Sequence, residues 1–180
     1  MLIDLSLVIN NELKSYPGDP RVKLQQIASI EKDGFNNYEL SINMHAGTHI
    51  DGPKHMDGSK KNICDYALDR FHGKARIVNP KEPYQPKGEQ IVVIPMKNQT
   101  LSEGFIKELI RSKINLIVID KDSIDEAPYP LHKLLFKNNV FIVENAVNLH
   151  LLEKYPSFTI FAIPLKIEAD SSLIRLFAQV

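Results

Sequence analysis

The side chains best suited to chemistry in this chain lie close together, between His45 and His55. Three of the six histidines and one aspartate fall within this short stretch, in the pattern H-x-G-T-H-x-D-x-P-x-H. Neutral imidazole and carboxylate groups are good ligands for zinc and manganese. Because four such side chains occur at this close spacing, the stretch predicts a site for a divalent metal ion.

The backbone around these residues is expected to form a shaped loop. Gly47 and Gly52 permit backbone angles that other residues rarely adopt, and Pro53 stiffens the chain where it leaves the loop. The preceding residues, Tyr38 to Met44, alternate between polar and apolar side chains, as in a half-buried strand. The sequence therefore predicts a metal-binding loop that leaves a strand. The alternative is a histidine-rich surface loop without a function.

The composition predicts one domain, residues 1–180, and gives no reason to expect nucleic-acid or membrane partners. The 22 basic and 22 acidic side chains balance to a formal net charge of zero. The single cysteine, Cys64, cannot form an internal disulfide, which favours a reducing compartment. No apolar run approaches the ~18–20 residues of a membrane span. We therefore expect a cytoplasmic protein.

The spacing of apolar residues predicts an α/β fold with more strand than helix. The expected strands are 2–8, 22–27, 38–44, 75–78, 91–94, 115–120, 140–143, 158–163 and 173–177. The expected helices are 59–71, 102–112 (with Ser102 as N-cap) and 131–136. The unbroken apolar run in 115–120 is typical of a strand that is covered on both faces.

Two later residues, His132 and Glu144, are candidates to complete a metal site. Glu144 follows the apolar run from Val140 to Val143, and a carboxylate at the end of a buried strand is costly unless it is paired or binds a metal. It could instead emerge into solvent. His132 falls in a short predicted helix, where a single histidine usually has only a structural role. The residues alone leave both alternatives open.

The whole pattern from His45 to His55 resembles the signature of the metal-dependent cyclase family, which includes bacterial kynurenine formamidase (arylformamidase) and isatin hydrolase. The resemblance extends over nearly the whole chain. The family's late Pro-Leu-x-Ile-x3-Asp segment is similar to Pro164–Ile167 followed by Asp170. The resemblance implies a swivelling β/β/α architecture with a mixed sheet, and a homo-oligomer, either a dimer or a tetramer. It also implies a role in tryptophan catabolism.

The resemblance also implies roles for the site residues. In kynurenine formamidase a His and a Glu follow the first motif twelve residues apart, the separation of His132 and Glu144. Carried over, His45, His49 and Asp51 bind one ion, and Asp51 and Glu144 bridge to a second ion bound by His132. His55 is then the proton donor and acceptor. The cofactor is zinc or manganese, as one ion or two.

The resemblance has departures that bear on the substrate. Tyr16 lies in a Tyr-Pro-Gly-Asp segment where kynurenine formamidases carry Trp, at the border of the active-site mouth. Tyr16 could stack on an aromatic substrate, or it could belong to a plain turn. The segment Asp122–Asp125 resembles one that precedes the second half of the family's metal site. The family's late Ser-Pro is Ser172-Leu173 here, two residues before Arg175.

These residues suit metal-assisted hydrolysis of a small amide, and the resemblance implies an aryl formamide such as N-formylkynurenine as the first substrate. A bound divalent ion lowers the pKa of its water from ~15.7 toward ~7, and His55 can move the proton to the leaving nitrogen. One alternative is ring opening of an isatin-like cyclic amide. Another is a metal- or ligand-binding module without catalysis. A serine nucleophile is disfavoured because no G-x-S-x-G motif occurs.

Overall fold

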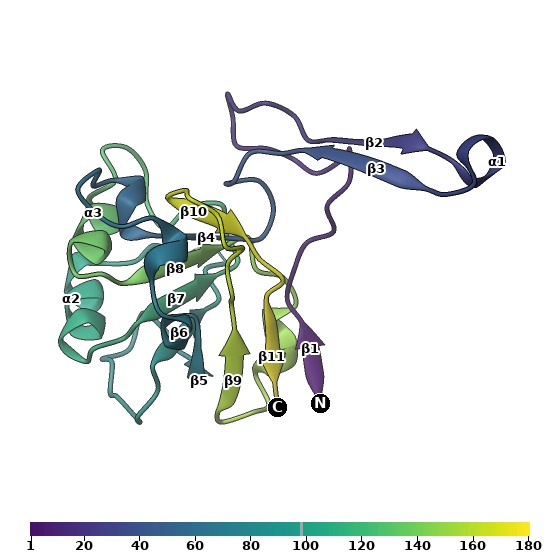
Figure 1. Ribbon diagram of the computed structural model, residues 1–180. Helices are drawn as coiled ribbons and strands as arrows, with labels where there is room; N and C mark the ends of the chain where they lie inside the picture. Colours follow the sequence, from purple (N-terminus) through teal and green to yellow (C-terminus); the bar gives the residue numbers. More distant parts are fainter. Residues whose placement is uncertain (98) are drawn as a thin grey trace.

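The computed structural model describes residues 1–97 and 99–180, and its centre is a curled, mixed β-sheet (Figure 1). In these residues nine strands follow the order β1-β11-β9-β5-β6-β7-β8-β4-β10. Their bounds are β1 (Leu2–Asp4), β4 (His49–Asp51), β5 (His72–Ile77), β6 (Ile91–Ile94), β7 (Leu116–Ile119), β8 (Phe141–Glu144), β9 (Phe158–Phe161), β10 (Ser171–Leu173) and β11 (Phe177–Gln179). The predicted α/β class is confirmed.

The middle of the sheet is parallel, and its two central strands, β6 and β7, are apolar along their whole length. Strands β5, β6, β7 and β8 run in the same direction, and every residue of β6 and β7 is buried. Helices α2 (Glu103–Arg111) and α3 (Pro130–Lys137) pack on one face. The hydroxyl of Ser102 accepts a hydrogen bond from the backbone N–H of Phe105, which confirms the predicted N-cap.

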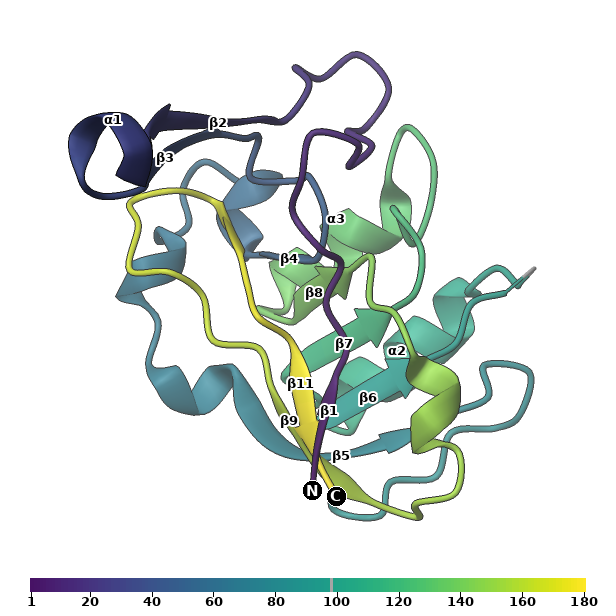
Figure 2. The same cartoon turned by 90° about the vertical axis from the view of Figure 1, so that its right-hand side faces the viewer.

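Because side chains alternate between the two faces of a strand, the sheet has two cores. Residues such as Ile117 and Ile142 pack against the helices, whereas Val118 and Val143 point into the curl formed with β1, β9 and β11. Figure 2 shows these last three strands side by side, close to both chain termini. None of the helices in the two described ranges is long and apolar enough to cross a membrane.

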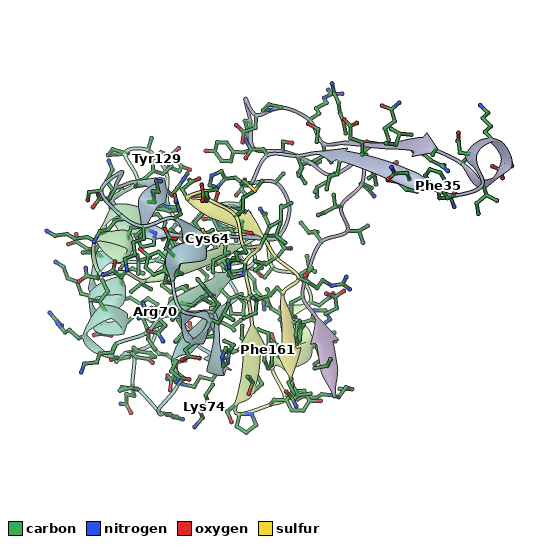
Figure 3. The ribbon with its side chains drawn as sticks, viewed as in Figure 1. Phe35, Cys64, Arg70, Lys74, Tyr129 and Phe161 are labelled. Carbon is green, nitrogen blue, oxygen red and sulfur yellow. The ribbon has the colours of Figure 1, made fainter. Side chains whose placement is uncertain are left out.

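A second, two-stranded sheet forms an arm that projects from the body. Strands β2 (Lys23–Ala28) and β3 (Asn37–Ser41) are antiparallel, and the short helix α1 (Ile30–Asp33) lies between them at the tip (Figure 1). The strands predicted at 22–27 and 38–44 are confirmed, but the half-buried face predicted for 38–44 is wrong. Every residue of β3 is exposed, because no helix or sheet within residues 1–97 and 99–180 covers either face of this strand. Phe35 at the tip is also exposed (Figure 3).

Two other predicted elements are wrong. The segment 59–71 contains the 3-10 turns Ile63–Asp65 and Leu68–Arg70 instead of an α-helix, because the intervening residues Tyr66 and Ala67 adopt extended backbone angles. Residues 173–177 do not form one strand. The chain leaves β10, which pairs with β4 at one end of the sheet, and enters β11, which pairs with β9 near the other end.

Candidate metal and active site

The pairing of β4 with β8 brings the first candidate residues together. His49 and Asp51 are two residues apart on β4, so their side chains point to the same face. His49 lies directly opposite Glu144 in the antiparallel register, on that same face. The imidazole Nε2 of His49 lies 3.5 Å from Asp51 Oδ1 and 3.5 Å from Glu144 Oε2. All three side chains are buried.

Two atoms at the centre of this cluster lack hydrogen bonds to any described residue: His49 Nε2 and Asp51 Oδ1. The other ring nitrogen of His49, Nδ1, lies 2.8 Å from the carbonyl oxygen of Gly47, which fixes the ring with Nε2 toward the carboxylates. Buried polar atoms are costly when unpaired, and buried carboxylates are normally paired or bind a metal. A nitrogen and two carboxylates that converge in this way fit a divalent cation.

His45 and His55 extend the cluster toward the surface. His45 Nδ1 lies 3.0 Å from Asp51 Oδ1, and the rings of His45 and His55 are 4.3 Å apart at their centres. Among the described residues there are two groups of three whose potential ligand atoms all lie within 4.8 Å of one another inside the group. They are His45, Asp51 and His55, and His49, Asp51 and Glu144. Asp51 belongs to both groups, so its position fits a carboxylate shared between two ions.

His132 reaches the cluster from helix α3. Its Nε2 lies 3.2 Å from Glu144 Oε1, and its Nδ1 is hydrogen-bonded to Asp125. The other oxygen of Asp125 accepts the backbone N–H of Leu131, in the first turn of α3. The five residues expected to bind metal therefore lie in one continuous group.

Two acidic residues beside the site were not predicted as part of it. Asp125 orients His132, and its only sequence signal was the family-like segment Asp122–Asp125. Asp170 Oδ2 lies 2.7 Å from His55 Nδ1, and its signal was the match to the family's late segment. Asp170 is 115 residues from His55 in sequence, so spacing alone could not reveal that contact, whereas Asp125 is only seven residues from His132.

The charges of the cluster shift its proton equilibria strongly. Burial lowers the pKa of His45, but the nearby Asp170 and Asp51 carboxylates outweigh burial and raise this pKa from 6.5 to about 9. Burial likewise opposes the charge on His49, but the Asp51 and Glu144 carboxylates raise its pKa to about 10. In the opposite sense, burial raises the pKa of Asp51, but the two imidazoles outweigh burial and hold it well below its usual range.

A cavity of about 1420 Å³ opens onto this group. His45, His55, His132 and Glu144 line it on the side of the cluster. Tyr16 and Tyr129 also line it, and the neighbouring Tyr129 raises the pKa of Tyr16. Figure 3 shows Tyr129 at the same end of the body as the arm. The buried cluster is thus accessible to a small molecule.

A buried His, Asp and Glu group where β4 pairs antiparallel with β8, open to a cavity, defines an α/β protein with a candidate metal centre. The model of the family described as "Putative cyclase" matches residues 3–99, and the chain belongs to this family.

Individual relatives agree with this assignment. The chain is 28% identical to a kynurenine formamidase of Bacillus cereus strain ATCC 14579, over 96% of this chain and 94% of that protein. It is 27% identical, with the same coverage, to a kynurenine formamidase of Bacillus anthracis.

The fold is similar to those of solved structures. An isatin hydrolase bound to the product analogue thioisatinate has a TM-score of 0.83 and 21% identity, over 99% of this chain and 92% of that chain. Isatin hydrolase A from Labrenzia aggregata has a TM-score of 0.85 and 18% identity, over 100% of this chain and 93% of that chain. At these identities the likeness establishes the shared architecture.

The raised pKa values predict how the metal-free protein responds to pH. A histidine whose pKa is higher in the folded than in the unfolded chain adds stability below its unfolded pKa, and that stability is lost as pH rises through the folded pKa. The stability is therefore lost between pH 6.5 and about 9 for His45, and between pH 6.5 and about 10 for His49. We expect the melting temperature of chelator-treated protein to fall over this range. Asp51→Asn, which removes the shared carboxylate, should flatten the dependence. Equal slopes in both proteins would contradict this origin.

Proposed function

We propose that this protein is a metal-dependent hydrolase of a small amide, with an aryl formamide as its substrate class. The observation that carries this proposal is the pair of unpaired buried atoms, His49 Nε2 and Asp51 Oδ1, beside a cavity that His55 also lines. The relatives named kynurenine formamidase, which match nearly the whole chain, support the formamide.

We propose the following ligands for the metal, which is zinc or manganese. His45, His49 and Asp51 hold one ion, and Asp51 and Glu144 bridge to a second ion held also by His132. Asp51 belongs to both groups of potential ligand atoms, which supports its role as the shared carboxylate. The 3.2 Å contact between His132 Nε2 and Glu144 Oε1 supports placing these two residues at the second ion. When bound, a divalent ion supplies a lowered water pKa and a polarised substrate carbonyl.

In this proposal His55 transfers the proton. Its side chain is partly exposed, it lines the cavity, and its Nδ1 is engaged by Asp170, so its Nε2 is available to the substrate side. His55 takes the proton of the attacking water and returns it to the leaving nitrogen, so that the C–N bond breaks to give formate and an aromatic amine. Phe136 packs edge-on to the ring, at 6.2 Å between centres, and restricts its rotation.

The alternative substrate is an isatin-type cyclic amide, whose ring opening would use the same residues. Both substrates present an aromatic ring beside a carbonyl, and the two tyrosines of the cavity suit such a ring. The third possibility is a metal-binding module without catalysis. The access of His55 to the cavity disfavours that possibility, because a structural metal site is normally closed by its ligands.

The experiment uses protein stripped of metal and then loaded with zinc or manganese. The substrates are N-formylkynurenine, a simple formanilide and isatin, and metal content is measured alongside turnover. Hydrolysis of a formamide that requires added metal supports the proposal, and faster opening of isatin would move the substrate to the alternative class. Stoichiometric metal without turnover of any of the three would favour the binding module and overturn the proposal.

Tyr16→Ala tests whether this residue contributes to the substrate site. Tyr16 lines the cavity and its side chain is about half exposed, so we expect it to contact the aromatic ring of the substrate rather than the ion. The variant should raise KM several-fold, since an aromatic pair contributes about 1 kcal/mol. Its metal content should stay unchanged. An unchanged KM for the best aromatic substrate would assign Tyr16 to a plain turn.

We further propose a cytoplasmic homo-oligomer, a dimer or a tetramer. The balanced charge supports self-association, because it leaves little long-range repulsion between copies. The single cysteine supports a reducing compartment. Sedimentation of the purified protein measures the number of subunits.

A further inference from the structure

The loop that carries Asp170 is fixed against the histidine motif by its backbone. The carbonyl oxygen of Asp170 accepts the N–H of Gly52 at 2.9 Å, and that of Ala169 accepts the N–H of Ile63 at 2.7 Å. The approach is so close that a Cβ on Gly52 would lie 2.9 Å from the Asp170 oxygen. Residue 52 must therefore be a glycine, because any side chain would displace the backbone of Asp170. The two backbone hydrogen bonds hold the Asp170 residue in a fixed position.

The side chain of Asp170 is directed at His55. Its Oδ2 lies 2.7 Å from His55 Nδ1, which is a hydrogen bond, whereas the same oxygen is 3.6 Å from His45 Nε2. His45 Nε2 has a nearer neighbour in the hydroxyl of Ser171, at 3.3 Å. The short contact of the carboxylate is thus with the histidine that lies outside the proposed ligand set.

This contact decides which nitrogen of His55 carries the proton. An ionised carboxylate can only accept hydrogen bonds, so His55 Nδ1 must donate, and in the neutral ring Nε2 is then the basic nitrogen. The ring is confined on its other sides by Phe136, at 6.2 Å, and by His45, at 4.3 Å between ring centres. Asp170, Phe136 and His45 together restrict the His55 ring to one orientation, in which one edge of the ring faces the cavity.

We propose that Asp170 is the positioning residue for proton transfer: it selects the Nδ1–H tautomer of His55 and aims Nε2 at the substrate. This inference rests on the proposed function, because it assigns a task to the proton-transferring residue of the same site. The carboxylate itself does not reach the substrate, and no step requires it to gain the proton. Removing it leaves the base present but in the wrong tautomer.

The test compares Asp170→Asn with Glu168→Gln in zinc-loaded protein. Glu168 is an exposed acid on the same loop, so its variant makes the same change of charge without touching His55. We expect Asp170→Asn to lower kcat about 10²-fold, within the range for impaired general acid–base catalysis. KM and zinc content should stay near the values of the unmodified protein. Asp170→Glu, which keeps a carboxylate, should recover part of kcat.

A second readout does not depend on turnover. Nitrogen-15 spectra of the imidazoles distinguish the two neutral tautomers, and His55→Ala identifies the His55 signals by their loss. The unmodified protein and the Glu168→Gln variant should show Nδ1–H at His55, whereas Asp170→Asn should shift toward Nε2–H. This spectrum separates the two proposals: if no amide is hydrolysed, the proposed function fails while the tautomer still reports on Asp170.

Three outcomes would overturn the inference. The first is loss of zinc from Asp170→Asn, which would make Asp170 a support of the metal site. The second is an unchanged His55 tautomer in Asp170→Asn. The third applies if thermal melts show that Asp170→Asn is unfolded. In that case Asp170→Glu is the test variant. If it is folded and His55 is in the Nε2–H tautomer, a carboxylate at this position does not select the tautomer.

Discussion

Replacing His49 with alanine should strip the metal from the protein and remove hydrolysis with it. The side chain is almost fully buried, and its Nε2 faces Asp51 and Glu144 without a hydrogen-bond partner among the described residues. The variant deletes a direct ligand, so metal affinity should fall by more than the roughly 10–100-fold typical of changes to the partners of ligands. The loss of rate should follow the loss of metal.

The measurement is metal content after dialysis against a fixed concentration of zinc or manganese, together with turnover. His150→Ala is the matched control, because His150 is exposed and lies outside both groups of potential ligand atoms. It should keep metal and rate. Retention of stoichiometric metal by His49→Ala would refute the proposed ligand set, whatever happened to turnover.

Replacing His55 with alanine should have the opposite signature, with metal retained and chemistry lost. Asp170 holds Nδ1 of this histidine at 2.7 Å, and its ring lines the cavity. We expect kcat to fall ~10²–10⁴-fold, the usual range for the loss of general acid–base catalysis. The pH–rate profile should lose one limb, because the proton-transferring group is gone.

Metal analysis decides between the two roles that the geometry allows for His55. One group of potential ligand atoms contains His55 together with His45 and Asp51. If His55→Ala loses metal as completely as His49→Ala, His55 is a ligand. Proton transfer must then be assigned to Glu144 or to water.

The sequence alone was sufficient for features that depend on neighbouring residues. The fully apolar strands β6 and β7 and helix α2 with its Ser102 cap follow from local periodicity and hydrogen bonding. His49 and Asp51 share a face because side chains two apart on a strand always do. The candidate ligands could therefore be chosen from residue types, spacing and the resemblance to the cyclase family.

Predictions from the sequence were wrong where the burial or the extent of a strand depends on which other segments pack against it. The alternation of side chains in 38–44 correctly indicated a strand, but it could not show that this strand lies in an arm without a covering layer. The run 173–177 is apolar apart from Arg175, which led to its prediction as one strand. Its division into β10 and β11 depends on which strands, β4 and β9, each part pairs with.

Only the tertiary structure decided how the site is assembled. Glu144 faces His49 because β4 inserts beside β8 in one register, and a shift by one residue would turn every side chain of β4 to the opposite face. Asp170 meets His55 across 115 residues of chain, through a loop seated on Gly52. Side-chain types and local spacing determine which chemistry a chain can support. Contacts between distant segments depend on the packing of the whole sheet. These contacts decide which side chains meet at the site and which atom of each side chain faces the metal or the substrate.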